Sequence, residues 1–301
     1  DLLSIKELSA SEILKIFKLT DELKARPGKF ARKLAGKTLA LIFEKPSNRT
    51  YVSFQVGMFQ LGGNSIYLGP EHIKLGVRET VHDVAKTLSR YVNAIVLRTF
   101  AHTTVVDMAA YASIPVINGL SDLTHPCQGL TDLYTMREKF STLKNLKLAY
   151  IGDGNNVCHS LLYGCAKLGV DCAIATPVKY EPDHTVLKEA SAFAQGSGAK
   201  ITLSHDPYKA VSGSDVIYTD VWASMGQEKE ARVRKKVFHD FQVNGALVKR
   251  AKRGALIMHC LPAHRGEEIT DEVMMSEHSV VFDQAENRLH VQKAILITLL
   301  G

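Results

Sequence analysis

Residues suited to chemistry gather directly after the first long apolar run of the chain. The stretch EKPSNRTYVSF, residues 44–54, places Ser47, Asn48, Arg49 and Thr50 before a helical pattern. A helix N-terminus presents unpaired N–H groups and partial positive charge, so it attracts anions. A guanidinium at that place can pair with two phosphate oxygens at once. By itself, however, the stretch favours a simpler interpretation, in which Ser47 or Asn48 only caps the helix.

Two further candidates follow later apolar runs in the first half of the chain. Arg98 ends the run AIVLR, where it either binds a ligand or pairs with a structural carboxylate. The motif HPCQ contributes His125 and Gln128, and Pro126 suits the first position of a helix. A single histidine at a helix entrance is more often a hydrogen-bonded core residue than a catalyst. These residues need support from elsewhere in the chain.

The second half adds candidates of the same kind. GDGNN, residues 152–156, resembles a dinucleotide fingerprint, but its third glycine is missing and no acidic residue clearly follows at the expected distance, which argues against nicotinamide binding. Asp220 could instead be a helix cap, and Cys260 a small buried apolar residue. The candidates of this half that follow strands or enter the last helix are Asn156, Asp220, Ser224, Met225, Cys260, Leu261 and Arg288.

The elements that must position these residues alternate regularly. Apolar runs rich in β-branched residues predict strands at 37–43, 64–68, 93–100, 113–119, 146–154, 171–177, 199–205, 215–220 and 255–262. Helical patterns separate the runs, as at residues 78–91. Near-continuous apolar strands that alternate with helices imply parallel sheets covered on both faces. The fold class is therefore α/β, with two doubly wound parallel-sheet (Rossmann-like) domains joined by helices.

In such sheets ligands bind beyond the carboxyl ends of the strands. Nearly all the candidates follow a predicted strand, whereas polar residues within helices are usually solvated. We therefore expect the candidates to act as binding groups. The pattern TDLYTMREKFSTLKN predicts a helix that joins the two domains, and the apolar segment QAENRLHVQKAILITLLG predicts a last helix that packs back onto the first domain.

Composition limits the class of partner. The chain has 301 residues, 46% of them hydrophobic and 23% charged, which suits two globular domains. Its net charge of +6 is spread along the chain without a dense basic block, which favours a small acidic ligand over nucleic acid. No apolar run approaches membrane-spanning length, and the polar N-terminus is unlike a secretory signal. Five cysteines without a C-x-x-C pair predict free thiols in a reducing compartment, without disulfides or a zinc site.

Together these motifs identify a family. The stretches FEKPSNRT, LRTFAH, HPCQ, GDGNNVCHS, DVWASMGQE, HCLPAHRGEE and AENR occur in the order found in the aspartate/ornithine carbamoyltransferase family. Over nearly its whole length the chain resembles the ornithine enzymes of that family, which combine SMG with HCLP. Aspartate and putrescine enzymes lack SMG.

The resemblance implies a transferase that moves the carbamoyl group of carbamoyl phosphate to the δ-amine of L-ornithine, giving L-citrulline and phosphate. Alternatives are a carbamoyltransferase for another amine, such as putrescine or an acylated ornithine, and a catalytically silent relative that binds carbamoyl phosphate. No metal or organic cofactor is implied, because carbamoyl phosphate is already activated. The implied partners are these small substrates, with neither nucleic acid nor membrane.

The family resemblance also implies which residues of this chain form the site. Cys260, Asp220, His125 and Arg98 are expected to be catalytic, with Cys260 as proton acceptor near the δ-amine. The ornithine-binding residues implied are Asn156, Asp220, Ser224 and Met225. The carbamoyl phosphate-binding residues implied are Ser47, Asn48, Arg49, Thr50, Lys74, Arg98, His125, Gln128, Cys260, Leu261 and Arg288.

The resemblance also implies an organisation. Residues 1–138 form the carbamoyl phosphate-binding domain, residues 139–284 form the ornithine-binding domain, and a helix at 285–301 packs back onto the first. A cytoplasmic homotrimer, or a multiple of trimers, that serves arginine biosynthesis is the expected setting, with each site at a subunit boundary.

The chain departs from the family pattern at a few positions. Asn48 and Tyr51 replace the first Thr and second Arg of the usual Ser-Thr-Arg-Thr-Arg, and Gln55 replaces a Glu. A cation and an anion are thus lost together, as expected for a missing Arg–Glu pair. Lys74 stands where ornithine enzymes usually have Gln or His, on a loop expected to reach the neighbouring subunit's site. Lys74 either restores positive charge near the phosphate or is a solvated loop lysine.

Overall fold

The computed structural model describes residues 1–224, 226 and 228–301, except for the side chain of residue 228. The chain divides into two compact units. Unit 1 comprises Asp1–Thr131 together with Glu286–Gly301, and unit 2 comprises Asp132–Ala285. The first boundary lies inside one long helix, α5 (Pro126–Phe140), and the second lies inside another, α12 (Val281–Leu300).

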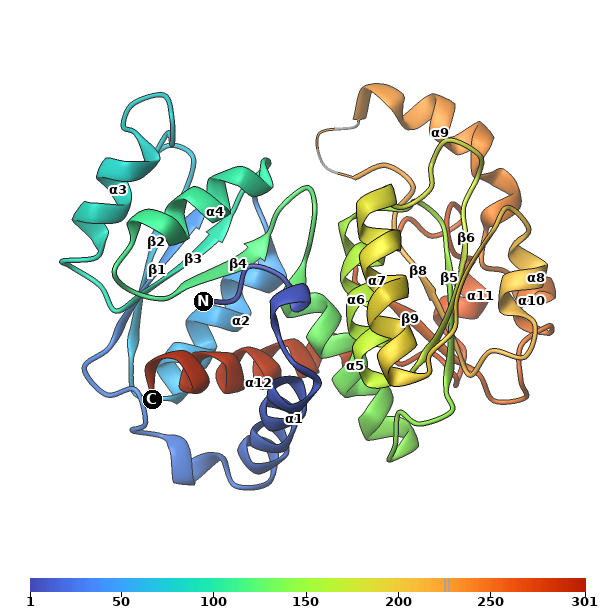
Figure 1. Ribbon diagram of the computed structural model, residues 1–301, viewed down its shortest axis with the longest axis horizontal. Coiled ribbons are helices and arrows are strands. Elements are labelled where there is room, and N and C mark those ends of the chain that lie inside the picture. Colours follow the sequence, from blue (N-terminus) through green and yellow to red (C-terminus); the bar gives the residue numbers. More distant parts are fainter. Residues whose placement is uncertain (225, 227) are drawn as a thin grey trace. The chain divides into compact units, whose positions relative to one another are not determined.

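Unit 1 contains a four-stranded parallel sheet in the order β2-β1-β3-β4. Its strands are β1 (Thr38–Phe43), β2 (Asn64–Leu68), β3 (Ala94–Arg98) and β4 (Val116–Leu120). The helices between and before them are α1 (Ala10–Ala25), α2 (Asn48–Gln60), α3 (Val81–Leu88) and α4 (His102–Tyr111), with short 3₁₀ turns η1 (Ile5–Glu7) and η2 (Pro27–Phe30) (Figure 1). Every residue of β3 is buried, as its continuous apolar run predicts.

The end of α12 belongs to unit 1, where it packs against α2. The Lys293 ammonium donates to Gln60 Oε1 at 2.8 Å, and the Lys24 ammonium on α1 donates to Asn287 Oδ1 at 2.7 Å. Gly57 lets the two helices approach closely, because a Cβ there would lie 3.3 Å from the Lys293 side chain.

Unit 2 contains a five-stranded parallel sheet in the order β7-β6-β5-β8-β9. Its strands are β5 (Lys147–Ile151), β6 (Asp171–Ala175), β7 (Ile201–Ser204), β8 (Val216–Thr219) and β9 (Leu256–His259). Its helices are α6 (Asn156–Leu168), α7 (His184–Ser197), α8 (Pro207–Val211), α9 (Ala231–Val237), α10 (Gly245–Val248) and α11 (Asp271–Met274), with 3₁₀ turns η3 (Glu228–Glu230) and η4 (His239–Phe241).

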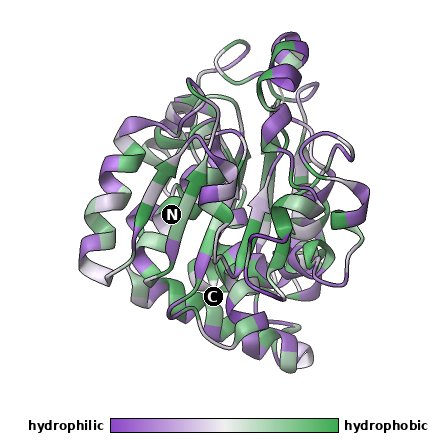
Figure 2. Cartoon of the chain, turned by 90° about the vertical axis from the view of Figure 1, so that its right-hand side faces the viewer, coloured by the Kyte–Doolittle hydropathy of each residue, from purple (hydrophilic) through white to green (hydrophobic). Residues whose placement is uncertain are grey.

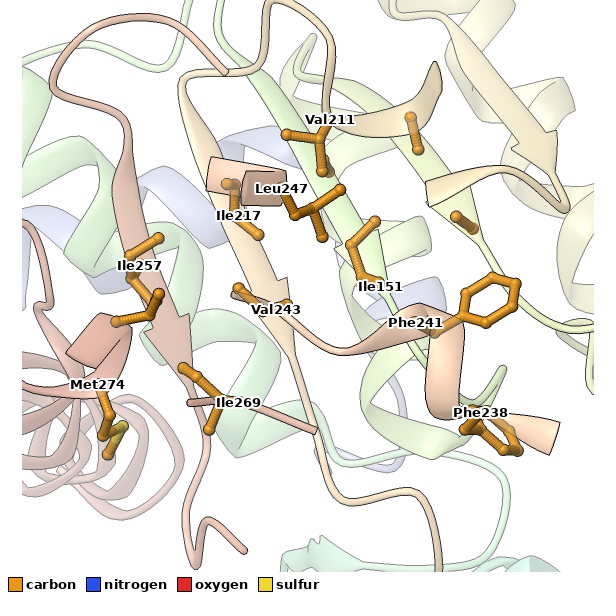
Figure 3. Close-up of a cluster of buried hydrophobic side chains, with 14 of the residues drawn as sticks. Ile151, Val211, Ile217, Phe238, Phe241, Val243, Leu247, Ile257, Ile269 and Met274 are labelled. Atoms are coloured by element: carbon orange, nitrogen blue, oxygen red, sulfur yellow. The ribbon is translucent and has the colours of Figure 1, made fainter. Parts of the chain in front are cut away.

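Side-chain hydrophobicity explains where each sheet lies. The strands are mostly apolar along their length, whereas the helices alternate apolar and polar faces (Figure 2). On one side of the unit 2 sheet, Ile151, Ile217 and Ile257 from β5, β8 and β9 pack with Phe238 and Met274 (Figure 3). In unit 1, the faces of α3 and α4 cover the sheet, with Val84 and Met108 fully or almost fully buried. Burial of these side chains stabilises the α/β arrangement.

The strand order defines where ligands can bind. In unit 1 the chain runs from β1 to an edge at β2 and then crosses to β3. In unit 2 it runs from β5 through β6 to an edge at β7 and then crosses to β8. Each sheet therefore has a topological switch point, at β1/β3 and at β5/β8, and open α/β sheets bind ligands outside the carboxyl ends of the strands there.

These observations confirm the predicted fold class and all nine predicted strands. The five cysteines are free thiols, as predicted. Within the described part of the chain, no helix is long and apolar enough to cross a lipid bilayer.

Candidate active site

The N-terminus of α2 lies at the unit 1 switch point. Ser47 is the N-cap, with extended backbone, and its Oγ accepts from the Thr50 N–H at 3.3 Å. Asn48 and Arg49 form the first turn of the helix. Both interpretations of the stretch are thus compatible, because a Ser47 cap uses one N–H and the first turn presents others.

Buried polar side chains from distant parts of unit 1 accompany this helix end. Arg98, the last residue of β3, is 5% exposed, and His125, directly before α5, is also 5% exposed. Burial lowers the pKa of His125 well below its usual 6.5, and the nearby charges of Arg288, Arg98 and Arg49 lower it further. The imidazole is therefore neutral at pH 7, and three guanidinium groups lie close enough to act on it.

Arg288 ties two more predicted residues into this group. Its Nη1 donates to Gln128 Oε1, and its Nη2 donates to Thr50 Oγ1 at 3.1 Å. Because the Thr50 oxygen accepts from Arg288, its own hydroxyl hydrogen can be directed to a ligand. We call Ser47–Thr50, Arg98, His125, Gln128 and Arg288 the anion-binding cluster. The structure thus brings together, within unit 1, residues that are up to 241 positions apart in the sequence.

The ends of β1 and β3 are joined by contacts that hold this cluster. The Glu44 N–H donates to the Arg98 carbonyl at 2.8 Å, and the Thr99 hydroxyl donates to the Glu44 carboxylate. The Lys45 ammonium lies 4.2 Å from the centre of the Phe100 ring. Glu44 and Lys45 were missed by sequence reasoning, although both belong to the recognised stretch FEKPSNRT.

Tyr51 replaces the missing arginine by aromatic packing. Its ring lies 4.7 Å from that of Tyr67 on β2, which in turn lies 5.6 Å from Phe43 on β1. The first turn of α2 is therefore held to the sheet by ring contacts, which are insensitive to salt.

Lys74 lies apart from these contacts within the chain. Its side chain is exposed, and among the described residues it has no hydrogen bond or ion pair, whereas its carbonyl accepts from the Val77 and Arg78 N–H groups. Its role in phosphate binding stays a prediction.

Unit 2 brings together a second group at its own switch point. Asp220 directly follows β8, and Cys260 directly follows β9. The Cys260 thiol donates to Asp220 Oδ1 at 2.9 Å, and Asn155 Nδ2 donates to Asp220 Oδ2 at 2.7 Å. Asn155 is also the N-cap of α6, where its Oδ1 accepts from the Val157 and Cys158 N–H groups. We call Asn155, Asp220 and Cys260 the carboxylate–thiol group.

The other residues predicted for this group have different positions. Asn156, the first residue of α6, is half-buried, as is Ser224. Leu261 follows Cys260 with a left-handed backbone, φ 61°. Met225 lies outside the described residues. The role of Asn156 in ornithine binding stays a prediction, and Asn155, which was not predicted as a site residue, is the asparagine bonded to Asp220.

Arg234 was not predicted at all. This residue of α9 is buried, and its Nη1 lies 2.9 Å from Asp153 Oδ2 and donates to the Trp222 carbonyl at 2.9 Å. Its Nε donates to Glu230 Oε2 at 3.1 Å. Arg234 therefore joins the segment that carries Ser224 to the loop after β5. The sequence could not distinguish Arg234 as a buried residue, because two further cationic residues directly follow it in α9.

Asp153 is the acidic partner in this junction. Burial raises the pKa of its carboxyl from 3.8 to about 6, against the lowering effect of the Arg234 charge. Gly154, next to it, has no room for a side chain, because a Cβ would lie 2.2 Å from the Pro182 nitrogen. Close backbone packing thus accounts for a glycine that resembled part of a dinucleotide fingerprint.

One set of side chains could hold a metal ion by distance alone. Asp220, His259 and Cys260 offer ligand atoms within 4.8 Å of one another. However, His259 Nδ1 accepts from the Leu261 N–H at 2.8 Å, and its Nε2 lies 3.1 Å from Glu268 Oε1. A metal ion at the ring would have to displace one of these bonds, so the donor set fits a metal poorly.

Comparisons with known proteins agree with the motifs. The family model described as aspartate/ornithine carbamoyltransferase, carbamoyl-P binding domain, matches residues 1–138, and that of the Asp/Orn binding domain matches residues 144–299. The chain is 56% identical over 307 residues to ornithine carbamoyltransferase from Pyrococcus horikoshii, covering all of this chain and 96% of the relative. It is 55% identical over 307 residues to the anabolic ornithine carbamoyltransferase from Pyrococcus furiosus, again covering all of this chain and 96% of the relative. The solved structure of ornithine carbamoyltransferase from Pyrococcus furiosus superimposes with a TM-score of 0.98 at 55% identity, covering 100% of this chain and 97% of that one.

Proposed function

The chain belongs to the aspartate/ornithine carbamoyltransferase family, and we propose that it transfers the carbamoyl group of carbamoyl phosphate to the δ-amine of L-ornithine. The products are L-citrulline and phosphate. The observation that carries the chemistry is the gathering of Arg49, Arg98 and Arg288 around a neutral His125 at the start of α2. A compact dianion beside a polarisable carbonyl suits this arrangement of charge and neutral donors.

The phosphate of carbamoyl phosphate is both the group that the protein binds and the leaving group of the reaction. We propose that the first-turn N–H groups of α2, with Ser47, Asn48, Arg49, Thr50 and Arg98, hold its oxygens and stabilise them as the C–O bond breaks. Because guanidinium groups stay charged at all relevant pH, this stabilisation does not depend on a proton arriving from solvent.

The carbonyl oxygen gains negative charge as the amine attacks. Thr50, His125 and Arg98 are the proposed donors to this oxygen, and loss of one such donor typically costs about 3–4 kcal/mol of barrier. Arg288 holds Gln128 Oε1 and Thr50 Oγ1 in place. The Gln128 side-chain oxygen and the Leu261 carbonyl are proposed to orient the carbamoyl NH₂ group by accepting from it.

The attacking amine must first lose its proton. With a lysine-like pKa near 10.4, only about 1 molecule in 2,500 is neutral at pH 7, a cost of roughly 4.6 kcal/mol. The carboxylate–thiol group provides an anionic oxygen and a sulfur for the amine. Cys260 is the proposed proton acceptor, and its own thiol proton passes to the Asp220 carboxylate, to which it already donates, as the sulfur takes up the proton of the ammonium group. Asn156, Ser224 and Met225 are proposed to hold the α-amino and α-carboxylate groups. In the transfer itself, the amine nitrogen bonds to the carbonyl carbon as the bond to phosphate breaks.

Citrulline formation tests the proposal directly. The purified protein should form citrulline from carbamoyl phosphate and L-ornithine, and should prefer L-ornithine to putrescine and Nα-acetylornithine. A preference for putrescine, which has no α-amino acid end, would overturn the assignment of Ser224 and Asn156. Phosphate release without any carbamoylated product, or no release at all, would contradict transferase activity.

We further propose that the enzyme is a cytoplasmic homotrimer, or a multiple of trimers, that serves arginine biosynthesis. The free thiols support a reducing compartment, and the relative from Pyrococcus furiosus is named as anabolic. Unit 1 exposes Phe59, Val77 and Tyr91 at 80%, 83% and 75%, which suits burial against another subunit. A particle near three times 33.2 kDa in sedimentation equilibrium is expected. A stable monomer with full activity would contradict the assembly.

A further inference from the structure

The turn after β9 carries two groups assigned to the reaction, in adjacent residues. Cys260 donates to Asp220, and Leu261 offers the carbonyl proposed to accept from the carbamoyl NH₂ group. Leu261 has φ 61°, a left-handed conformation that costs a branched or bulky residue free energy. Some contact must therefore hold this peptide in place.

The ring of His259 supplies that contact. Its Nδ1 accepts from the Leu261 N–H at 2.8 Å, so this nitrogen carries no proton. Its Nε2 therefore carries the proton and donates to Glu268 Oε1 at 3.1 Å. Both side chains are 0% exposed, so the His259–Glu268 bond does not compete with water.

Independent contacts fix the two ends of this arrangement. The His259 N–H donates to Gln284 Oε1 at 3.0 Å, and Gln284 Nε2 donates to Asp132 Oδ1 at 2.7 Å. Glu268 Oε1 also accepts from the His264 N–H at 2.6 Å. The His259 backbone is thus held by the sheet and by Gln284, so a change in its ring acts on the Leu261 peptide more than on the strand.

We propose that His259 is a positioning residue for the transfer reaction: its Nδ1, aligned by Glu268, fixes the Leu261 peptide and hence the direction of the Leu261 carbonyl and the Cys260 thiol. The inference rests on the roles proposed above for Cys260 and Leu261. A displacement of about 1 Å in such groups is enough to lower a rate about 100-fold.

Two substitutions separate the two nitrogens of the ring. In His259→Asn the amide oxygen takes the place of Nδ1 and can still accept from the Leu261 N–H. In His259→Gln the longer side chain puts its amide group at the place of Nε2, so the acceptor for the Leu261 N–H is lost. We expect kcat to fall about 100-fold in His259→Gln and less than about 10-fold in His259→Asn, with KM for ornithine within about 3-fold in both. His239→Asn and His239→Gln, at a histidine whose side chain is 85% exposed, are the matched controls and should behave as wild type.

A third substitution tests the role of Glu268. Its Oε2 has no hydrogen-bond partner among the described residues. In Glu268→Gln an amide nitrogen can occupy that place while Oε1 keeps both bonds. We expect this variant to retain kcat within about 5-fold, because alignment of the ring needs the acceptor oxygen and not the negative charge.

A readout other than activity separates this inference from the proposed function. The other four cysteines are buried, so alkylation by iodoacetamide reports the orientation of Cys260. His259→Gln should change the alkylation rate several-fold, and His259→Asn should leave it near the wild-type value, even if another amine proves to be the substrate. Equal losses of kcat in the Asn and Gln variants, with equal falls in Tm and equal alkylation rates, would overturn the positioning role. So would wild-type kcat in His259→Gln.

Discussion

Asn155 Nδ2 donates to Asp220 Oδ2 at 2.7 Å while Asn155 Oδ1 caps helix α6. One side chain thus joins the loop after β5 to the carboxylate after β8, across the switch point of the unit 2 sheet. The other oxygen of the same carboxylate accepts from Cys260. The orientation of Asp220 is therefore set by an amide, by a thiol and by the Val221 N–H, which donates to Asp220 Oδ1 at 2.8 Å.

The Asn155→Ser variant separates these two roles. Serine is a good N-cap but cannot reach Asp220, so we expect a Tm close to wild type and a fall in kcat of about 10-fold, as for one lost hydrogen bond to a charged group. The control is Asn244→Ser, the same change at the N-cap of α10. Equal kcat in the two variants would show that the Asn155–Asp220 bond does not matter for the reaction.

The Arg234→Gln variant tests the junction behind the Ser224 segment. Arg234 pairs with Asp153 and holds the Trp222 carbonyl, so its loss should raise KM for ornithine about 10- to 100-fold and leave KM for carbamoyl phosphate unchanged. Arg232→Gln, two residues earlier and exposed on the same helix, is the control. Similar increases in KM for both substrates would indicate a general loss of structure.

The pH dependence of ornithine binding should report Asp153. Its pKa in the folded protein is about 6, so the carboxylate is ionised and pairs fully with Arg234 only above that pH. As pH falls through 6, the KM calculated for ornithine with an uncharged δ-amine should rise by about 10-fold. This rise in KM should be absent in Asp153→Asn. The same group affects stability in the opposite direction, because a pKa raised above 3.8 favours the folded state as pH falls from 6 towards 4. A step near pH 6 that persists in Asp153→Asn would assign it to another group.

The stability of the protein should depend on His125 in acid. The pKa of the folded histidine is lowered, whereas the unfolded one takes up a proton near pH 6.5, so its contribution is full above pH 6.5 and is lost below it. From pH 6.5 to 5.5 the wild type should lose about 1 kcal/mol of unfolding free energy through this group. The difference in unfolding free energy between the wild type and His125→Gln, measured by urea unfolding at fixed protein concentration, should narrow by that amount over the same pH range. A constant difference would show that His125 titrates normally.

Lys74→Gln tests whether the exposed lysine contributes to phosphate binding. If Lys74 acts at a neighbouring subunit's site, we expect KM for carbamoyl phosphate to rise about 10-fold, and the increase should shrink at high salt. Lys86→Gln, on α3 of the same unit, should leave KM unchanged. An unchanged KM in Lys74→Gln would identify Lys74 as a solvated loop residue.

The sequence by itself determined the order of elements and the edge at which chemistry occurs. The spacing of apolar residues and the local composition predict strands and helices. A parallel sheet then places residues such as Arg98 and Asp220 at the ends of strands. The Ser47 cap could also be predicted, because capping depends on residues three positions apart.

Only the tertiary structure decided which of the similar candidates are joined. It chose Asn155 over Asn156 as the partner of Asp220, assigned Arg234 to Asp153 rather than to solvent, and gave both nitrogens of His259 a partner. Local sequence cannot determine these contacts, because hydrogen bonds and ion pairs act over about 3 Å between groups far apart along the chain. Packing of whole strands and helices sets those distances, and with them the charge state and direction of each group.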